Sequence, residues 1–556
     1  MNEEQPIKIK IDNFERQKVD MINKKNNFIR QGGDKAGNYS AAEKSETRDK
    51  SFDKIKNNNK SGIWMKIGKL SLYLLIFLLP LFFLPLTIAP LEISKQVLAS
   101  FLVLISFICY LSDSIETRKI VYHKSLLGLA VLALLAVSAA SAVFSQAKSV
   151  SFFGDLIQPD SLLCFAVYGL AFYLAGIFFR KKDFNKIGVI FLASLVLTAV
   201  FGLLQLLGHF ILSFISPGLK FTEQTGFNSL GSFSNWSIFI AFGLVLIVSA
   251  LASLRLPLIL KAVLSVISLF IIGELIIINY SFLWLAIALC MLILTAYCFT
   301  VQKKINIPLA VMIVSLFFTL ISSSLPVIIK TPAEVRPSFS STFDIAKQTI
   351  WSKNDRSLAE NGKNILFGSG PATFSYDYSL YRSNDSNQTD FWQTRFSQGF
   401  SFIISFLATG GLLGILAVLF LVFAFARQAI KNLENKEALA GSIGALFMII
   451  MLALFPPSTV QFVFVFLALG LMAPESSAKE ISFLNVSKTK SFLAFIALTF
   501  FIVGSMALFY SVGQKYAAAV YYQKGITDYN QSGDLIKSLV NLDSASALDS
   551  GSDQYL

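Results

Sequence analysis

The sequence predicts an all-α fold: a polytopic membrane bundle of about thirteen helical spans with one large extracytoplasmic loop. Of its 556 residues, 54% are hydrophobic and only 15% are charged, whereas soluble domains carry about 25% charged residues. Apolar runs of about twenty residues, the length that crosses a bilayer as a helix, recur along the chain. Few Gly-x-Gly or Asn-Gly turns separate these runs, which favours helices over the alternating strands of an outer-membrane barrel.

Charge and residue usage exclude several function classes. The net charge is +13, but Lys and Arg gather in short loops and near the N-terminus, as the positive-inside rule predicts. We therefore expect no nucleic-acid partner. The 4 Cys residues fall in apolar runs and the 2 His residues are far apart in sequence. Neither a disulfide framework, nor a metal site, nor a cofactor is expected from this pattern.

Residues 1–62 form a predicted disordered, basic cytoplasmic tail, because they are rich in Lys, Asn, Asp and Ser and poor in large apolar residues. The segment is too polar and too long to be the start of a cleaved signal peptide. Its basic residues could touch anionic membrane lipids. A solvated tail that helps to fix the topology is the simpler interpretation.

Hydropathy and length predict the spans. Their approximate positions are 69–89, 93–112, 125–144, 159–179, 187–210, 233–253, 258–279, 281–300, 307–326, 399–426, 438–456, 458–474 and 491–511. They form an N-terminal transmembrane bundle at 63–326 and C-terminal transmembrane helices at 399–511, separated by the large loop at 327–398. Alternate connections are rich in Lys and Arg, so the N-terminus is expected inside, and the large loop and the tail at 512–556 outside.

Three charged residues within or beside predicted spans are unusual. Glu92 and Lys95 are three residues apart, so they can pair on one helix face. Glu274 is alone in an apolar run. Ionisable groups inside a bilayer are costly and often functional. A structural ion pair for the first two, and a carboxyl hydrogen-bonded to a neighbouring helix for the third, are the alternatives.

Two shorter outer loops, 145–158 and 211–232, are expected on the same side of the membrane as the large loop. The first contains Phe152-Phe153-Gly154 and Gln158, and the second contains Lys220 and Glu223. All three loops can therefore line one cavity. The intervening Gly, Pro and Asn residues indicate loops and not buried strands.

The large loop is polar and basic, and it is too long to be a simple connector. Residues 341–359 are predicted to form one amphipathic helix on the membrane surface, with Phe343, Ile350 and Trp351 on its apolar side. The Gly368-Ser369-Gly370 turn lacks the Lys and Ser/Thr of a phosphate-binding loop, so we expect it to form a tight backbone turn.

The last segment, 516–548, is typical of one tetratricopeptide-like helical hairpin, although its spacing is one residue longer than a regular repeat. Ala518, Tyr521, Gly525 and Leu542 carry the pattern. One hairpin cannot bury both of its faces, so we expect it to pack on the large loop, to bind a protein partner, or to be a fragment of a longer array. A pair of juxtamembrane helices with no repeat relationship is the alternative.

Three motifs in fixed order resemble the O-antigen ligase and O-antigen polymerase superfamily of bacterial membrane proteins. They are Phe-Gly-x-Gly-Pro-x-x-Phe at 367–374, Phe-Trp-x-x-Arg-Phe at 391–396 and Thr-Gly-Gly-x-x-Gly at 409–414. The Phe-Phe-Gly at 152–154 and the Phe-Asn-x-x-Gly-Ser at 227–232 fit the same group. The resemblance covers about 69–474, and a tetratricopeptide-like tail also occurs in such proteins.

This resemblance implies a GT-C-like glycosyltransferase in the bacterial inner membrane, which transfers a glycan from a polyprenyl pyrophosphate to a lipid, glycan or protein acceptor in cell-envelope polysaccharide synthesis. Arg and Lys from the outer loops would stabilise the leaving pyrophosphate. The motifs do not distinguish ligation from polymerisation. The expected catalytic residues are Arg395, Arg382, Asp390 and Glu223, and the expected substrate-binding residues are Lys220, Gln158, Gly368, Gly370, Trp392 and Lys95.

The sequence departs from the family at the general base. Many ligases carry a His in the large loop just before the following span, but here that position reads Gln398-Gly399-Phe400-Ser401 and the loop has no His. Asp390, Glu223 and Asp160 are the available carboxylates, and the sequence does not choose among them.

Two other function classes stay open. A lipid-glycan transporter is favoured by Glu274 and by the pair Glu92 and Lys95, because transporters use such groups. A non-catalytic envelope scaffold is favoured by the hairpin tail and by the missing His.

Overall fold

The computed structural model describes residues 62–155, 158–212, 220–302, 306–322, 324, 334–352, 357–383, 390–473, 478–483, 488–552 and 555. The chain divides into two units, Met1–Lys66 and Ile67–Leu556. Every described element except the first turn of α2 lies in the second unit. The predicted tail at 1–62 lies outside the described residues except for its last position.

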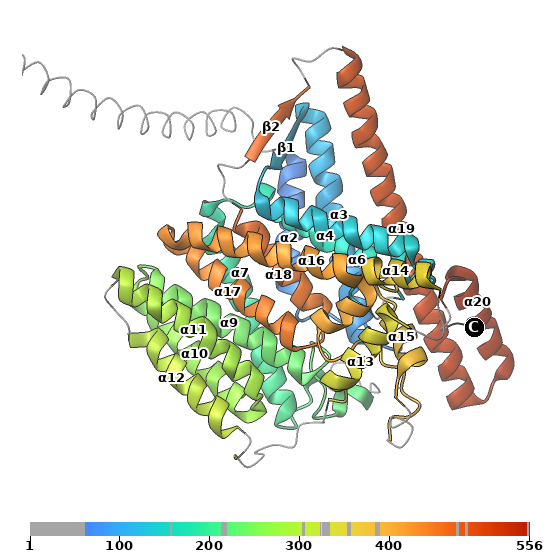
Figure 1. Cartoon of the computed structure of the whole chain (residues 1–556). Helices are drawn as coiled ribbons and strands as arrows, with labels where there is room; N and C mark the ends of the chain where they lie inside the picture. The colour runs from blue at the N-terminus through green and yellow to red at the C-terminus, as the bar shows by residue number, and fades with distance from the viewer. Residues whose placement is uncertain are drawn as a thin grey trace, which may run out of the picture. The chain divides into compact units, whose positions relative to one another are not determined.

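Long apolar helices make up most of the described chain (Figure 1). Each predicted span overlaps one helix, although the first span, 69–89, shares only its first half with α2. The helices are α2 (Ile63–Leu78), α3 (Pro90–Thr117), α4 (Leu126–Phe144), α6 (Leu162–Phe178), α7 (Phe184–Leu206), α9 (Phe233–Ser253), α10 (Leu258–Ile278), α11 (Ser281–Tyr297), α12 (Asn306–Ile321), α16 (Phe402–Lys431), α17 (Lys436–Leu454), α18 (Thr459–Leu471) and α19 (Lys488–Ser532). In the part of the chain that the structure describes, 8 helices are long and apolar enough to cross a membrane. The helical class is confirmed and a membrane protein is indicated; the larger number of spans stays a prediction.

Serine residues begin several of these helices. The side-chain oxygens of Ser125, Ser161, Ser232 and Ser458 each accept a hydrogen bond from a backbone N–H in the first turn of α4, α6, α9 and α18. Such caps satisfy an N–H that has no partner within the helix. Each helix therefore begins where a polar residue precedes an apolar run.

Aromatic side chains fill the centre of the bundle. The Phe165 ring lies 5.7 Å from the Phe462 ring and 5.8 Å from the Phe406 ring, both in edge-to-face geometry. Tyr168 stacks on Phe462 at 5.1 Å. These contacts join α6, α16 and α18, and edge-to-face and offset stacking are the favourable arrangements for aromatic pairs.

A small antiparallel sheet lies at the C-terminal end of α3. Strand β1 (Lys119–His123) pairs with β2 (Ala478–Ser482), so that Lys119 lies opposite Ser482 and His123 opposite Ala478. The Phe483 N–H extends this ladder by donating to the Arg118 carbonyl at 3.0 Å. The sheet thereby ties the end of α3 to the segment that precedes α19.

Three short helices form the described part of the large loop: α13 (Phe339–Ile350), α14 (Leu358–Phe367) and α15 (Phe374–Tyr381). The prediction of one helix at 341–359 is wrong, because α13 ends at Ile350 and a second helix begins at Leu358. Its predicted apolar side, which is expected to lie on the membrane surface, stays a prediction. Phe343 and Trp351 are exposed, whereas Thr342, Ile345, Ala346 and Thr349 are the buried side chains of α13.

Helix α19 continues without a break from its apolar part into the tail. It has 45 residues, which corresponds to a length of roughly 67 Å. Helix α20 (Leu535–Leu548) packs back on it, and Gly525 lies against the Leu542 side chain. A helical hairpin is therefore present as predicted, but the boundary placed at 512 falls inside one helix; its relationship to tetratricopeptide repeats stays a prediction.

Candidate functional site

Two of the glycine motifs lock into each other. The Ser369 N–H donates to the Ala408 carbonyl at 3.1 Å, and the Gly370 N–H donates to the Thr409 carbonyl at 2.9 Å. Helix α16 is kinked at this level, because Gly411 has φ 64 and ψ −163. The turn at 368–370 between α14 and α15 therefore docks into the kink of α16 (Figure 1).

Only glycine fits where these two motifs meet. Gly368 has φ 69 and ψ −161, a region of backbone space that is essentially restricted to glycine. A Cβ atom there would lie 2.4 Å from the Ala408 carbonyl oxygen. A Cβ at Gly411 would lie 2.6 Å from the Gly368 backbone nitrogen. Each glycine thus makes room for the backbone that carries the other.

The first outer loop closes the other side of the turn. A Cβ atom at Gly370 would lie 2.3 Å from the Ser145 hydroxyl and 2.5 Å from the Ser151 hydroxyl. Ser151 lies in α5 (Lys148–Phe153), and its hydroxyl donates to that of Ser145 at 2.7 Å. The Ser141 hydroxyl of α4 donates to the Phe367 carbonyl at 2.6 Å and to the Thr409 carbonyl at 3.0 Å.

A hydroxyl and carboxylate network supports the turn from within. The Ser369 hydroxyl donates to an Asp377 carboxylate oxygen at 2.6 Å and lies 2.7 Å from the Thr373 hydroxyl. The Thr373 hydroxyl contacts the Gly370 carbonyl at 2.6 Å. Thr373 and Asp377 are buried. The network therefore fixes the direction in which α15 leaves the turn.

Two predicted site residues from different loops meet on α15. The Gln158 Nε2 donates to the Ser375 hydroxyl at 3.2 Å, and the Arg395 Nε donates to the Ser375 carbonyl at 3.3 Å. The Arg395 guanidinium also lies over the Tyr376 ring, 4.4 Å from its centroid. Gln158 is buried and Arg395 is exposed. Arg395 thus places a positive charge on the surface, next to a buried polar contact between the first outer loop and the large loop.

A second basic residue lies close by in the chain. The Arg382 guanidinium donates to the Trp392 carbonyl at 2.6 Å. Trp392 and Asp390 are exposed in the turn that precedes Arg395. The structure therefore brings Arg382 to the segment that carries three other predicted site residues.

Asp160 is a buried carboxyl that follows the first outer loop, two residues before α6 begins. It is 5% exposed, and its Oδ1 has no hydrogen-bond partner among the described residues. Burial, and to a smaller extent the nearby Asp155 carboxylate, raise its pKa to about 7. The Oε1 of Gln158, two residues away, is also buried without a described partner. A carboxyl held near neutrality can take up or release a proton at physiological pH.

Lys95 and Glu92 bind other groups instead of each other. Lys95 is 0% exposed and donates to the carbonyls of Phe82 and Ser229. Glu92 accepts hydrogen bonds from the backbone N–H and the hydroxyl of Thr459, the first residue of α18. No ion pair within 4.0 Å joins the two among the described residues. Lys95 therefore holds the second outer loop, and its place in a substrate site stays a prediction.

The remaining predicted residues of the second outer loop are not joined to Arg395. Glu223 is exposed at the end of η2 (Lys220–Glu223), and no described hydrogen bond or ion pair links it to the large loop. The Lys220 side chain lies outside the described residues. The large loop does contact the start of α9, just after the second outer loop, because the Glu334 carboxylate accepts from the Ser234 N–H at 2.7 Å.

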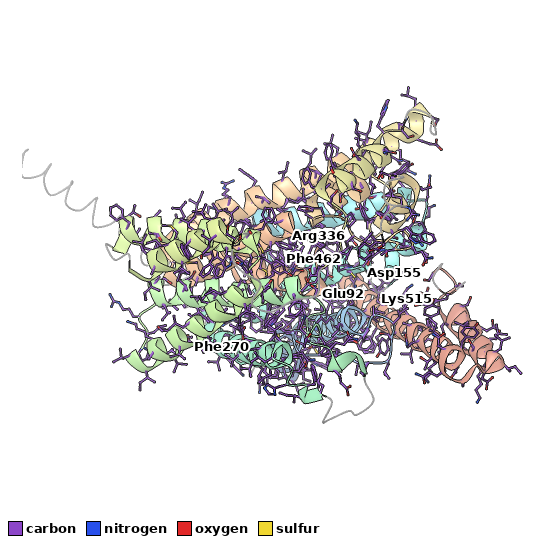
Figure 2. All side chains as sticks on the ribbon, turned by 90° about the horizontal axis from the view of Figure 1, so that it is seen from below. Glu92, Asp155, Phe270, Arg336, Phe462 and Lys515 are labelled. Carbon is purple, nitrogen blue, oxygen red and sulfur yellow. The ribbon has the colours of Figure 1, made fainter. Side chains whose placement is uncertain are left out.

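The tail touches the first outer loop. The Lys515 ammonium donates to the Gly154 carbonyl at 3.1 Å and forms an ion pair with Asp549 at 2.7 Å. Both side chains of the pair are buried. Figure 2 labels Lys515 and, close to it, Asp155, the residue that follows Gly154. A Cβ atom at Gly551 would lie 2.1 Å from the Ser149 hydroxyl. The described tail therefore contacts the loop at 145–155; packing on the large loop, one of the alternatives for the tail, stays a prediction.

The site residues that sequence reasoning missed are the internal supports, namely Ser145, Ser151, Ser375 and Asp377. The motif contains Ser369 and Thr373, but a run of small polar residues does not disclose which carboxylate they contact. Metal ligation finds no support in the described chain, where no group of three or more His, Cys, Asp or Glu side chains is placed to hold an ion.

Comparison of the chain with protein-family models found no match, and comparison with curated proteins found none either.

Proposed function

We propose that this protein is a membrane glycosyltransferase of the O-antigen ligase and polymerase type, which moves a glycan from a polyprenyl pyrophosphate to an acceptor at the outer side of the bacterial inner membrane. The observation that carries the proposal is the meeting of Gln158 and Arg395 on Ser375. It joins the first outer loop, the Phe-Trp-x-x-Arg-Phe motif and the glycine turn in one polar region.

The proposed reaction needs a cation, a base and a rigid support. The acceptor hydroxyl oxygen forms a bond to the anomeric carbon while the bond from that carbon to the pyrophosphate oxygen breaks. The pyrophosphate leaves with the electron pair, and its growing negative charge is stabilised by positive side chains. Arg395 and Arg382 are the proposed cations, because both lie on the loop beside the glycine turn.

The proton of the acceptor hydroxyl has to pass to a base. Asp160 suits this role best among the three carboxylates, because its pKa is raised to about 7 by burial and it stands two residues from Gln158. Asp390 and Glu223 are both exposed. A base is most effective when its pKa lies near the working pH.

The proposed topology has a cytoplasmic N-terminus, about thirteen spans and an outward large loop, with lipids on all sides of the bundle. Its support is the alternation of basic and non-basic connections along the chain. Labelling of single cysteines placed at Lys347 and at Lys124 with a membrane-impermeant reagent in intact cells tests it. Reaction at position 347 alone is expected, and reaction at 124 alone would reverse the orientation.

Replacing Arg395 by Ala tests the transferase proposal. Loss of one donor to the developing charge commonly costs about 10²-fold in rate, so transfer of a polyprenyl-linked glycan should fall by that order. Lys347→Ala is the matched control, because Lys347 is an exposed cation on α13 of the same loop. Equal surface glycan in Arg395→Ala cells, with normal protein level, would remove the proposal's main support.

A lipid-glycan transporter is the second candidate, and one observation favours it. Glu274 in α10 is 2% exposed, and neither carboxylate oxygen has a hydrogen-bond partner among the described residues. Buried membrane carboxyls commonly serve transport. Glu274→Gln should abolish lipid-glycan movement in vesicles if this candidate is correct, and should leave transfer from a donor already at the outer side unchanged if the protein is a transferase.

A further inference from the structure

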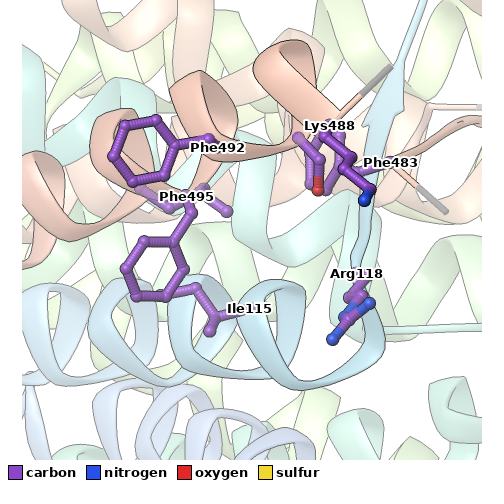
Figure 3. Close-up of a pocket in the computed structure, with 8 residues that line it drawn as sticks. Ile115, Arg118, Phe483, Lys488, Phe492 and Phe495 are labelled. Carbon is purple, nitrogen blue, oxygen red and sulfur yellow. The ribbon is translucent and has the colours of Figure 1, made fainter. Parts of the chain in front are cut away.

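A cavity of about 500 Å³ lies at the end of α3 that is remote from the site described above. It is enclosed by the last turn of α3, by the residue that follows β2, and by the first turns of α19 (Figure 3). Along α3 it is roughly 40 Å from Glu92, because each helical residue advances about 1.5 Å. It does not share a lining residue with the candidate transferase site.

The cavity has a basic side and an apolar side. Arg118, Lys488 and Ser491 contribute its polar lining, whereas Ile115, Leu498 and three phenylalanines contribute its apolar lining. Figure 3 shows Arg118 and Lys488 on one side and the rings of Phe492 and Phe495 on the other. Such a division suits a molecule with an anionic group at one end and a hydrocarbon chain at the other.

The backbone fixes the position of Arg118. This residue ends α3 in the left-handed conformation, with φ 53 and ψ 36. Its N–H donates to the Ile115 carbonyl at 3.3 Å, and its carbonyl accepts from the Phe483 N–H at 3.0 Å. A non-glycine residue held at positive φ is uncommon and needs such support from its surroundings. The guanidinium therefore starts from an anchored point on the cavity wall.

The two cations of the cavity have no acidic partner in the described part of the chain. The neighbouring Lys119 does, because its ammonium lies 3.4 Å from a Glu480 carboxylate oxygen. Arg118 and Lys488 are left to attract an anion from outside the described protein. Phosphate oxygens form strong, charge-assisted hydrogen bonds with Arg and Lys.

The apolar wall continues onto a helix face that has few protein neighbours. Only 11% of the apolar window of α19 is buried. Phe492 is 62% exposed and Phe495 is 52% exposed. A hydrocarbon chain that starts in the cavity can therefore extend along α19 among membrane lipids, which a soluble phosphate cannot do. This exposure favours a lipid over free phosphate as the occupant.

We infer that this cavity is a binding site for an anionic glycerophospholipid, whose phosphate contacts Arg118 and Lys488 and whose acyl chain lies against Phe492 and Phe495. The inference is independent of the proposed transferase activity. It assigns the basic residues at this end of α3 and α19 a specific ligand in addition to the general attraction of Lys and Arg for anionic membranes.

Native mass spectrometry of the full chain released from detergent micelles tests the inference, with phosphatidylglycerol, phosphatidylcholine and inorganic phosphate as probes. We expect retained adducts with phosphatidylglycerol, fewer with phosphatidylcholine and no effect of inorganic phosphate. The double variant Arg118→Gln/Lys488→Gln should bind phosphatidylglycerol about tenfold more weakly, because two charge-assisted contacts are lost.

The matched control is Lys119→Gln/Lys490→Gln. It removes the same charge from the same two chain segments, but neither residue lines the cavity. Retained binding in this control is expected, whereas an equal loss would mean that general surface charge holds the lipid and would overturn the inference. Displacement of phosphatidylglycerol by inorganic phosphate would also overturn it, because the occupant would then be a soluble anion.

A second variant covers the case in which the double variant does not fold. Ser491→Trp fills the cavity and leaves both cations in place, so it should also lose the phosphatidylglycerol adduct. Unchanged adducts in Ser491→Trp, with an unchanged melting temperature, would show that the lipid binds elsewhere and would refute the site.

Discussion

The substitution Gly368→Ala tests the interlocking of the two glycine motifs. The new Cβ atom would lie 2.4 Å from the Ala408 carbonyl oxygen and 2.6 Å from the Thr409 carbonyl oxygen. Both are backbone atoms of α16, so no side chain can rotate out of the way. The turn has to lift off the helix, and the hydrogen bonds from Ser369 and Gly370 to α16 are then broken.

The expected loss of stability has two parts. Residues held in the backbone region of Gly368 cost about 1–3 kcal/mol when they are not glycine. Two lost backbone hydrogen bonds cost about 1 kcal/mol each. Together they give a loss of about 3–5 kcal/mol, which is at the upper end for a single substitution.

Gly362→Ala is the matched control, because Gly362 lies in α14 six residues before the turn and a Cβ atom there meets nothing within 4 Å. Alanine in a helix is more stable than glycine by about 1 kcal/mol, so this control should be neutral or slightly stabilising. The measurement is the intrinsic-fluorescence melting temperature of both variants in the same detergent, together with the rate of proteolysis in the large loop. Equal melting temperatures and equal proteolysis for the two variants would refute the interlocking.

Three further predictions concern buried polar groups. Raising the pH from about 4 to 7 should destabilise the protein through Asp160, since its folded pKa of about 7 lies above the unfolded value and burial disfavours the charged form. The variant Asp160→Asn should flatten this part of the plot of melting temperature against pH. An unaltered slope in the variant would contradict the prediction. Lys515→Met should destabilise the packing of the tail by about 3–5 kcal/mol, because it leaves Asp549 buried without its partner. Adding Asp549→Leu should restore the protection of 512–556 from proteolysis. Unrestored protection in the double variant would count against the ion pair. Glu92→Leu should cost about 1–3 kcal/mol, because both hydrogen bonds from Thr459 end on one carboxylate oxygen and leucine offers no acceptor. A melting temperature equal to that of the native chain would contradict this.

Helices were predictable from the sequence because their signal is local. An apolar run of spanning length specifies a helix without reference to any other part of the chain, and a Ser before the run marks its start, as at Ser161. The missed break in the large loop had a local signal too. Ser357 and Glu360 form a capping box, which marks a helix start and separates α14 from α13.

Pairings between distant segments were not predictable in the same way. Strands β1 and β2 are only five residues long and more than three hundred residues apart in sequence. Each gains its structure only from the other, so neither has a recognisable pattern alone. The contact of Lys515 with Gly154 is of the same kind, since a Lys just beyond an apolar span is expected on topological grounds and reveals no partner.

The backbone arrangement of the candidate site was predictable from the sequence, whereas its ionisable side chains were less predictable. The packing of the two glycine motifs explains this difference. Gly368 and Gly411 are required by the backbone, because each leaves room for the other segment. Arg395 and Asp160 are required by no such packing: the first is exposed, and the second has an oxygen without a described partner. A backbone arrangement of this kind can therefore stay the same while the residues that move protons or bind charge differ. The absence of a His before α16 does not by itself argue against a transferase. For the proposed transferase, the candidate bases are then the carboxyls around this site, and Asp160 is the buried one among the three considered.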